Sequence, residues 1–192
     1  QGYLTAHLPI REHNDLTSET AETHSMSMEF FTEPWMELFF GERAGDYREM
    51  HFEDTLMFIP YGTMVDEFQN IVYKHPEMTP EERNELWKKL EKEYRPHLDY
   101  KDNPFLNEGR LWQKQSHIYE NPYYYIDYCL AAVNALQYKA FMKRDFKEAW
   151  KSYMEFSHLS ASLFFTELEK KAGLMSPFEE GSIRKLVEGL ED

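Results

Sequence analysis

Residues 22–31 read Glu-Thr-His-Ser-Met-Ser-Met-Glu-Phe-Phe, a stretch with the spacing of a helix that carries two acids on one face. Positions i, i+3 and i+7 lie on the same side of an α-helix, so Glu22, Ser25 and Glu29 are expected to line one side. Methionine and phenylalanine make the surroundings apolar. A carboxylate in such surroundings is costly unless a cation or a hydrogen-bond donor pairs with it. The stretch is therefore a first indication of a metal site.

Helical patterns continue along the rest of the chain. Helices are predicted, in chain order, over residues 18–40, 44–59, 61–75, 79–94 and 122–143, from Phe146, from Leu163 to Gly173, and over 182–190. Because proline lacks an amide hydrogen, Pro34 and Pro60 are expected to interrupt the helical pattern. Residues 96–108 are predicted to form the longest loop. No stretch alternates apolar and polar residues, so the sequence predicts an all-α fold with little or no sheet, and residues 1–192 as a single helical unit.

The charge balance excludes several classes of partner. The chain has 21 basic and 35 acidic residues, a formal charge of −14. That balance disfavours binding to nucleic acid and to anionic membranes, and no apolar run approaches the roughly 20 residues that span a bilayer. Cys129 is the only cysteine, which rules out an intrachain disulfide. A cytoplasmic location is therefore expected, with Cys129 as a small buried core residue.

Two long motifs resemble a known family. The stretch at residues 22–30 is followed by Pro-Trp-Met-Glu-Leu-Phe-Phe at 34–40, and residues 117–128 read His-Ile-Tyr-Glu-Asn-Pro-Tyr-Tyr-Tyr-Ile-Asp-Tyr. Together they resemble the oligoendopeptidase F branch of the thimet oligopeptidase family. The resemblance covers essentially the whole chain. It implies a mostly helical zinc metallopeptidase that cuts short peptides inside a deep cleft.

The resemblance also implies which residues hold the metal. Glu22 matches the family's third zinc ligand, and Glu29 matches an outer acidic position that accepts a hydrogen bond from a liganding histidine. The other two ligands, both histidines, and the general-base glutamate belong to a His-Glu-x-x-His helix, a motif that these 192 residues do not contain. The chain is therefore expected to be the C-terminal part of a larger metallopeptidase catalytic domain. Its partners would be the missing N-terminal portion and short peptide substrates, and it is predicted to be inactive alone.

The same resemblance assigns roles in the tyrosine-rich segment. His117 and Tyr124 are implied as catalytic donors to the tetrahedral oxyanion, and Tyr119, Tyr123 and Tyr128 as substrate-binding residues. Helical spacing predicts that Tyr123 packs with Ile126 and Leu130, while Tyr124 joins Asp127 and Tyr128 on a more polar side. His24 points nearly opposite Glu22 and is interpreted as a structural histidine.

Two other interpretations remain open. Glu155 and His158 have the Glu-x-x-His spacing of a di-iron helical bundle, but a second copy of that spacing is lacking. The chain can also be an acidic helical structural or interaction domain with no catalysis of its own. In that case Glu22→Ala would leave the stability unchanged or raise it, because a buried carboxylate without a partner is only destabilising. The sequence leaves homo-oligomer formation open.

Overall fold

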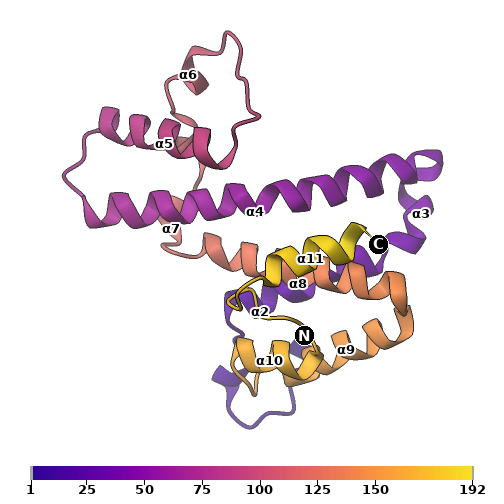
Figure 1. The fold of residues 1–192 in the computed structure, drawn as a ribbon. Helices are drawn as coiled ribbons and strands as arrows, with labels where there is room; N and C mark the ends of the chain where they lie inside the picture. The colour runs from indigo at the N-terminus through magenta and orange to yellow at the C-terminus, as the bar shows by residue number, and fades with distance from the viewer. Residues whose placement is uncertain (1, 192) are drawn as a thin grey trace. The chain divides into compact units, whose positions relative to one another are not determined.

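The computed structural model of the chain describes residues 2–191, and every regular element in that range is a helix (Figure 1). The all-α fold is thereby confirmed, since none of these residues forms a strand. With η for 3-10 helices, the elements are α1 (Gly2–Thr5), η1 (Arg11–Asn14), α2 (Ser18–Phe31), η2 (Glu33–Trp35), α3 (Glu37–Phe40), η3 (Gly41–Arg43), α4 (Ala44–Lys74), α5 (Pro80–Tyr94), α6 (Pro104–Asn107), η4 (Leu111–Lys114), α7 (His117–Glu120), α8 (Tyr125–Arg144), α9 (Phe146–Leu159), α10 (Phe165–Ala172) and α11 (Ser182–Glu191).

The chain divides into two compact units. One combines Gln1–Thr55 with Leu130–Asp192, and the other is Leu56–Cys129. In the first unit α10 packs along α9. Its core is rich in aromatic rings and includes Phe31, Tyr138, Tyr153, Phe156 and Leu168. The expectation that residues 1–192 form a single helical unit of a larger catalytic domain stays a prediction.

The second unit has its own aromatic core. The buried side chains of this core include Met64, Phe68, Trp87, Trp112 and Tyr125. Burial of a large ring removes its apolar surface from water, which stabilises the fold by about 25 cal/mol for each Å² buried. Part of the aromatic content that the sequence shows is therefore packed in these two cores.

Pro60 does not break its helix, so the prediction of two helices over 44–59 and 61–75 is wrong. The helix α4 runs without interruption from Ala44 to Lys74 with Pro60 inside it. Proline removes one helical hydrogen bond and crowds the preceding turn, which costs about 3 kcal/mol. The next turns bury Met64, Val65 and Phe68 completely. Packing of these side chains offsets the cost, because helices in proteins are stabilised mostly by tertiary contacts.

The helix predicted to open at Pro122 begins at Tyr125 instead. Tyr123 has a φ of 62°, in the left-handed region that a tyrosine seldom adopts. Its backbone N–H donates to the Oε1 atom of Gln69 at 3.1 Å, which ties this turn to α4. Because Tyr123 lies outside the helix, the predicted packing of Tyr123 with Ile126 and Leu130 on a helical stripe is wrong.

Local signals placed other helix ends correctly. Thr79 caps α5: its side chain accepts from the Glu82 backbone N–H, and the Glu82 side chain accepts from the Thr79 N–H. This reciprocal pair is a capping box, and it marks the start of the helix predicted over residues 79–94. At the C-terminal end of α10, Gly173 adopts the left-handed conformation, with a φ of 73°. The predicted loop at 96–108 contains the one-turn helix α6.

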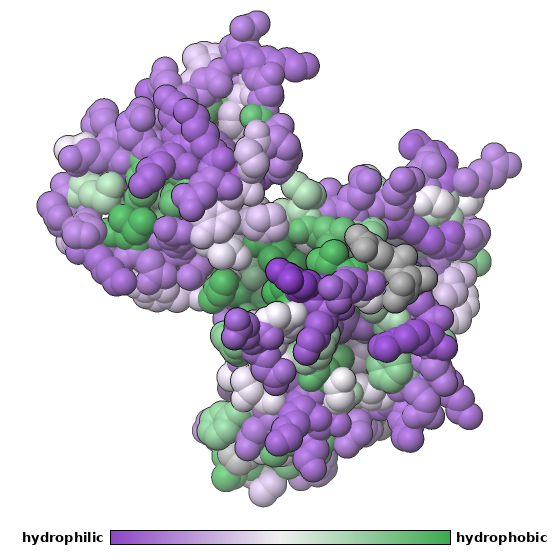
Figure 2. All heavy atoms as spheres, viewed as in Figure 1, coloured by the Kyte–Doolittle hydropathy of each residue, from purple (hydrophilic) through white to green (hydrophobic). Residues whose placement is uncertain are grey.

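The surface that can be seen in one view is mainly polar. On the face drawn in Figure 2, hydrophilic residues cover most of the surface. Within residues 2–191, no helix combines the length and the apolar character needed to cross a bilayer.

Candidate functional site

The acidic face of α2 is the more exposed side of this helix. Its buried residues are Thr20, Thr23, His24, Ser27, Phe30 and Phe31. These positions repeat every three or four residues, so they form the stripe that faces the core. Glu22 is half-buried, whereas Ser25 is exposed and the Glu29 side chain is 52% exposed. The expectation that both acids lie among apolar side chains is therefore wrong for Glu29.

Glu22 and Ser25 share the face that their spacing predicts. The hydroxyl oxygen of Ser25 lies 3.1 Å from the Oε2 atom of Glu22 and 3.1 Å from its carbonyl oxygen, so the hydroxyl hydrogen can be donated to either.

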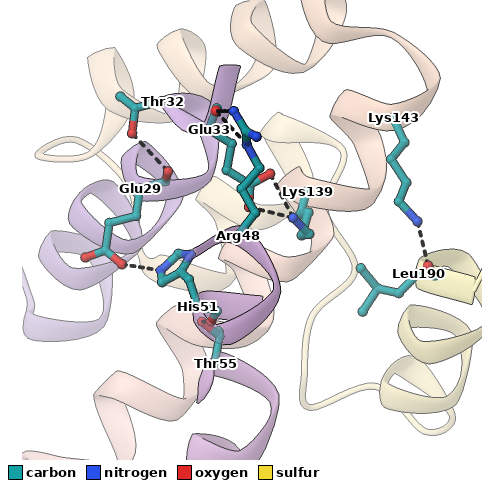
Figure 3. A network of polar contacts seen from close by, with 9 residues as sticks. All are labelled: Glu29, Thr32, Glu33, Arg48, His51, Thr55, Lys139, Lys143 and Leu190. Carbon is teal, nitrogen blue, oxygen red and sulfur yellow. Dashed lines mark hydrogen bonds and ion pairs between the residues drawn. The ribbon is translucent and has the colours of Figure 1, made fainter. Parts of the chain in front are cut away.

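Glu29 forms a short pair with a histidine that sequence reasoning did not select. The Nε2 atom of His51, on α4, lies 2.7 Å from the Oε2 atom of Glu29, and the His51 side chain is only 13% exposed. Figure 3 shows the two side chains pointing toward each other from different helices. The pairing depends on how α2 and α4 pack, and no local sequence signal predicts it.

His24 is a buried structural histidine, as its position on α2 opposite Glu22 indicates. Burial lowers the pKa of its imidazole from 6.5 to about 4, so the ring is neutral near pH 7. Ser157 donates its hydroxyl hydrogen to the carbonyl oxygen of Tyr153, at 2.8 Å, and its oxygen lies 3.0 Å from the Nδ1 atom of His24. The proton of His24 is thus on Nδ1, which donates to Ser157. Its Nε2 atom is buried with no hydrogen-bond partner in the described part of the chain.

In the second unit, three of the five residues selected in the tyrosine-rich segment come together. We call His117, Tyr124 and Tyr128 the His117 cluster. The rings of His117 and Tyr124 are parallel within 3° with centroids 5.9 Å apart, and the Tyr128 ring lies 5.8 Å from His117 and 4.9 Å from Tyr124. All three side chains are half-buried. The His117 cluster therefore brings one imidazole and two tyrosine side chains together at a partly exposed position.

The other two tyrosines have different contacts. Tyr119 is 57% exposed and its ring stacks on Trp112 at 6.1 Å. The Tyr123 ring meets Tyr73 edge-on at 5.4 Å, and Tyr73 donates its hydroxyl hydrogen to the carbonyl oxygen of Ile118.

Gln115 sets the orientation of His117, and sequence reasoning missed it. The Tyr61 hydroxyl donates to Oε1 of Gln115 at 2.8 Å, which leaves the amide nitrogen facing Nδ1 of His117 at 2.9 Å. An amide N–H can only donate, so Nδ1 of His117 accepts and the ring proton lies on Nε2. His117 can therefore donate a hydrogen bond through Nε2. In the sequence, the sign of this contact is that Gln115 lies only two residues before His117.

The lone thiol is not a nucleophile. Cys129 is buried, and burial raises the pKa of its thiol to about 12. The thiolate form is therefore scarce near neutral pH, and thiolate is the reactive form. Cys129 is confirmed as a small buried core residue. Among the residues whose side chains the structure describes, no group of three or more His, Cys, Asp or Glu could hold a metal ion.

Comparison with known proteins gives matches among solved structures. No family model matches the chain, and neither does any curated protein. A structure assigned to oligoendopeptidase F is 50% identical with a TM-score of 0.95, and the match covers 99% of this chain and 34% of that one. A Pz peptidase A with an inhibitor is 47% identical, with a TM-score of 0.94 and the same two coverages. An oligoendopeptidase F assigned in Bacillus anthracis str. Ames is 40% identical with a TM-score of 0.83, over 99% of this chain and 31% of that one.

Identities of 40–50% over nearly the whole chain show that it is related to these solved structures. The chain belongs with oligoendopeptidase F and Pz peptidase, which confirms the resemblance that its two motifs carry. It spans about a third of the length of these solved relatives, at 31–34%.

Proposed function

We propose that this chain is part of a zinc-dependent oligoendopeptidase that hydrolyses short peptides. The observation that carries the proposal is the match at 50% identity and a TM-score of 0.95 to a structure assigned to oligoendopeptidase F. The activity is proposed for a complete enzyme, because the chain spans about a third of its relatives, at 34%. A cytoplasmic location and homo-oligomer formation stay predictions.

Within that enzyme, Glu22 would be one of three protein ligands of the zinc ion. Its half-buried carboxylate fits this role, because zinc binds carboxylate oxygen and keeps a position open for water in catalytic sites. The two histidine ligands and the general base would come from the rest of the enzyme, so this chain alone would not hydrolyse peptides. Zinc, when bound, lowers the pKa of its water and polarises the peptide carbonyl.

The His117 cluster would act on the substrate. With its proton on Nε2, His117 has a hydrogen to donate, and the Tyr124 hydroxyl is a second donor. Neutral donors aimed at an oxygen that becomes negative in the transition state are worth about 3 kcal/mol each. We assign His117 and Tyr124 to that role and Tyr128 to substrate binding within the same cluster. Tyr119 and Tyr123 would bind substrate farther from the reacting bond.

The test uses a complete enzyme in which this chain replaces the matching third of the 50%-identical relative. We expect this chimera to cleave an internally quenched peptide and to lose that activity on chelation. Glu22→Gln should abolish tight zinc binding. Glu19→Gln is the matched control, a half-buried glutamate of the same helix whose charge acts on Glu169. Zinc binding that survives Glu22→Gln would contradict the proposed ligand.

A second candidate is an acidic helical interaction domain with no catalysis of its own. The observation in its favour is the apolar surface of α3, where Leu38 is 79% and Phe39 74% exposed. Apolar side chains exposed side by side are typical of surfaces that contact another protein. Under this alternative the chimera would fold but show no chelator-sensitive cleavage, and Glu22→Ala would leave stability unchanged or higher.

A further inference from the structure

The pair formed by Glu29 and His51 joins the acidic face of α2 to α4 (Figure 3). Its length of 2.7 Å is at the short end of the range for hydrogen bonds between nitrogen and a carboxylate. His51 is 13% exposed, whereas Glu29 is 52% exposed. The donor of the pair is thus held inside the fold while the acceptor faces outward.

Aromatic rings fix the position of the His51 imidazole. The Phe30 ring lies 4.7 Å away, and the Tyr47 ring lies 5.6 Å away and parallel within 4°. Tyr47 in turn stacks on Phe40 at 4.2 Å. A ring packed against two neighbouring rings has little rotational freedom, so the direction of its N–H bond is set by the fold.

The proton of His51 is on the nitrogen that faces Glu29. An ionised carboxylate only accepts hydrogen bonds, so the Nε2 atom must be the donor. The Nδ1 atom is buried and has no partner in the described part of the chain. A proton there would be a buried unpaired donor, which costs about 1–3 kcal/mol. The tautomer with its proton on Nε2 avoids that unpaired donor.

The second oxygen of Glu29 remains available. Its Oε1 atom accepts no hydrogen bond from the side chains and backbone that the structure describes. Glu29 follows Glu22 by seven residues, which places it about 10.5 Å farther along the helix axis. A zinc–nitrogen bond of about 2.1 Å and a hydrogen bond of about 2.8 Å leave room for one imidazole in that interval.

We propose that His51 is a positioning residue for the zinc site of the proposed peptidase. Its Nε2–H fixes one oxygen of Glu29, so that the other oxygen is oriented to accept from a histidine that binds zinc. A liganding histidine needs such a partner on its second nitrogen to fix its tautomer and ring orientation. The inference rests on the proposed function, but it concerns a residue and a contact outside the resemblance.

A purely structural role for the pair is less well supported, because other polar contacts already link α4 to η2, which follows α2 in the chain, and η2 to α8. Arg48, also on α4, donates to the carbonyl oxygen of Glu33 at 2.8 and 2.9 Å. The Glu33 carboxylate pairs with Lys139 at 2.6 Å, and those two side chains are 17% and 14% exposed. Figure 3 shows Glu33 between these two cations. The first unit therefore has a partly buried network of polar contacts that does not involve His51.

The experiment measures zinc affinity in the chimera by competition with a chelator. His51→Phe keeps a ring in the aromatic stack but has no donor, and His51→Gln keeps an N–H that can reach Glu29. We expect His51→Phe to weaken zinc binding about 10- to 100-fold and His51→Gln to recover most of it. The double variant with Glu29→Gln should be no weaker than Glu29→Gln alone. His75→Phe, which removes an exposed histidine–glutamate pair at 3.2 Å, should have no effect.

The outcomes separate the two proposals. If the unsubstituted chimera binds no zinc, the proposed function fails. If it binds zinc and His51→Phe binds as tightly, with the metal-free forms equally stable, the positioning role is overturned. Equal weakening in His51→Phe and His51→Gln also overturns it, because the donor would then be irrelevant.

A second measurement needs no metal. In the 192-residue chain with ¹⁵N-labelled histidine, the nitrogen chemical shifts report which nitrogen of His51 carries the proton. We expect a protonated Nε2 and a bare Nδ1, and we expect Glu29→Gln to change the Nε2 shift. A proton on Nδ1 would overturn the inference whatever the zinc measurements show.

Discussion

The buried carboxyl group of Glu169 should make the stability of the chain depend on pH. This carboxyl group on α10 is fully buried. Burial raises its pKa to about 7, against weak hydrogen bonding from Ser176 and Asn134, and the charges of Glu179 and Glu19 raise it further. Neither of its oxygens has a well-formed hydrogen bond within the described residues. The folded chain therefore favours the protonated acid.

The sign of the pH dependence follows from proton binding. Below pH 4.5 the acid is neutral in both the folded and the unfolded chain, so its burial carries no charge penalty. Between pH 4.5 and about 7 the unfolded chain releases the proton while the folded chain keeps it, so stability falls as pH rises. The interval from 4.5 to about 7, at 1.36 kcal/mol for each pKa unit, gives a loss of about 3 kcal/mol.

Urea unfolding of the wild-type chain and of Glu169→Gln, at pH 5 and at pH 8, measures this loss. From pH 5 to pH 8, we expect the free energy of unfolding of Glu169→Gln to rise by about 3 kcal/mol relative to that of the wild type. Taking the difference removes the contribution of His24, whose pKa is lowered by burial and whose titration acts in the opposite direction. Glu155→Gln, at an exposed position, is the control, and its free energy of unfolding should change with pH as that of the wild type does. A difference between Glu169→Gln and wild type that does not change with pH would refute the reasoning.

Three further predictions concern packing, capping and catalysis. Gly62→Ala should destabilise the chain by about 1–3 kcal/mol, because the added Cβ would lie 2.3 Å from the Cys129 sulfur. Adding Cys129→Ala to this variant should restore part of the lost stability. If urea unfolding shows no such coupling between the two substitutions, the contact is not the cause. Thr79→Ala removes the cap of α5 and should lower the free energy of unfolding by about 1 kcal/mol, with an unchanged midpoint as the contrary result. Tyr124→Phe in the chimera should lower kcat about 100-fold with little change in KM, and unchanged turnover would remove that hydroxyl from the mechanism.

The helix ends that the sequence predicted well are those with a local chemical cause. Thr79 and Glu82 cap α5 by contacts three residues apart, and Gly173 ends α10 because glycine adopts a positive φ without strain. The failures are at Pro60 and Tyr123. There, contacts from residues far along the chain outweigh the local preference.

The candidate site shows the same division. Helical spacing correctly put Glu22 and Ser25 together, and the motif that contains His117 and Tyr124 marked a real ring cluster. His51 could not be predicted, because its partner is 22 residues away on another helix. Which helix faces α2 is decided by packing, and spacing along one helix carries no information about it.

The most direct test of the central proposal is the position of zinc in a crystal of the chimera, located by anomalous scattering at the zinc absorption edge. We predict a zinc peak about 2.0–2.2 Å from a carboxylate oxygen of Glu22, and loss of that peak in Glu22→Ala. A zinc ion bound away from Glu22, or a peak that persists in Glu22→Ala, would contradict the assignment of this chain to the metal site.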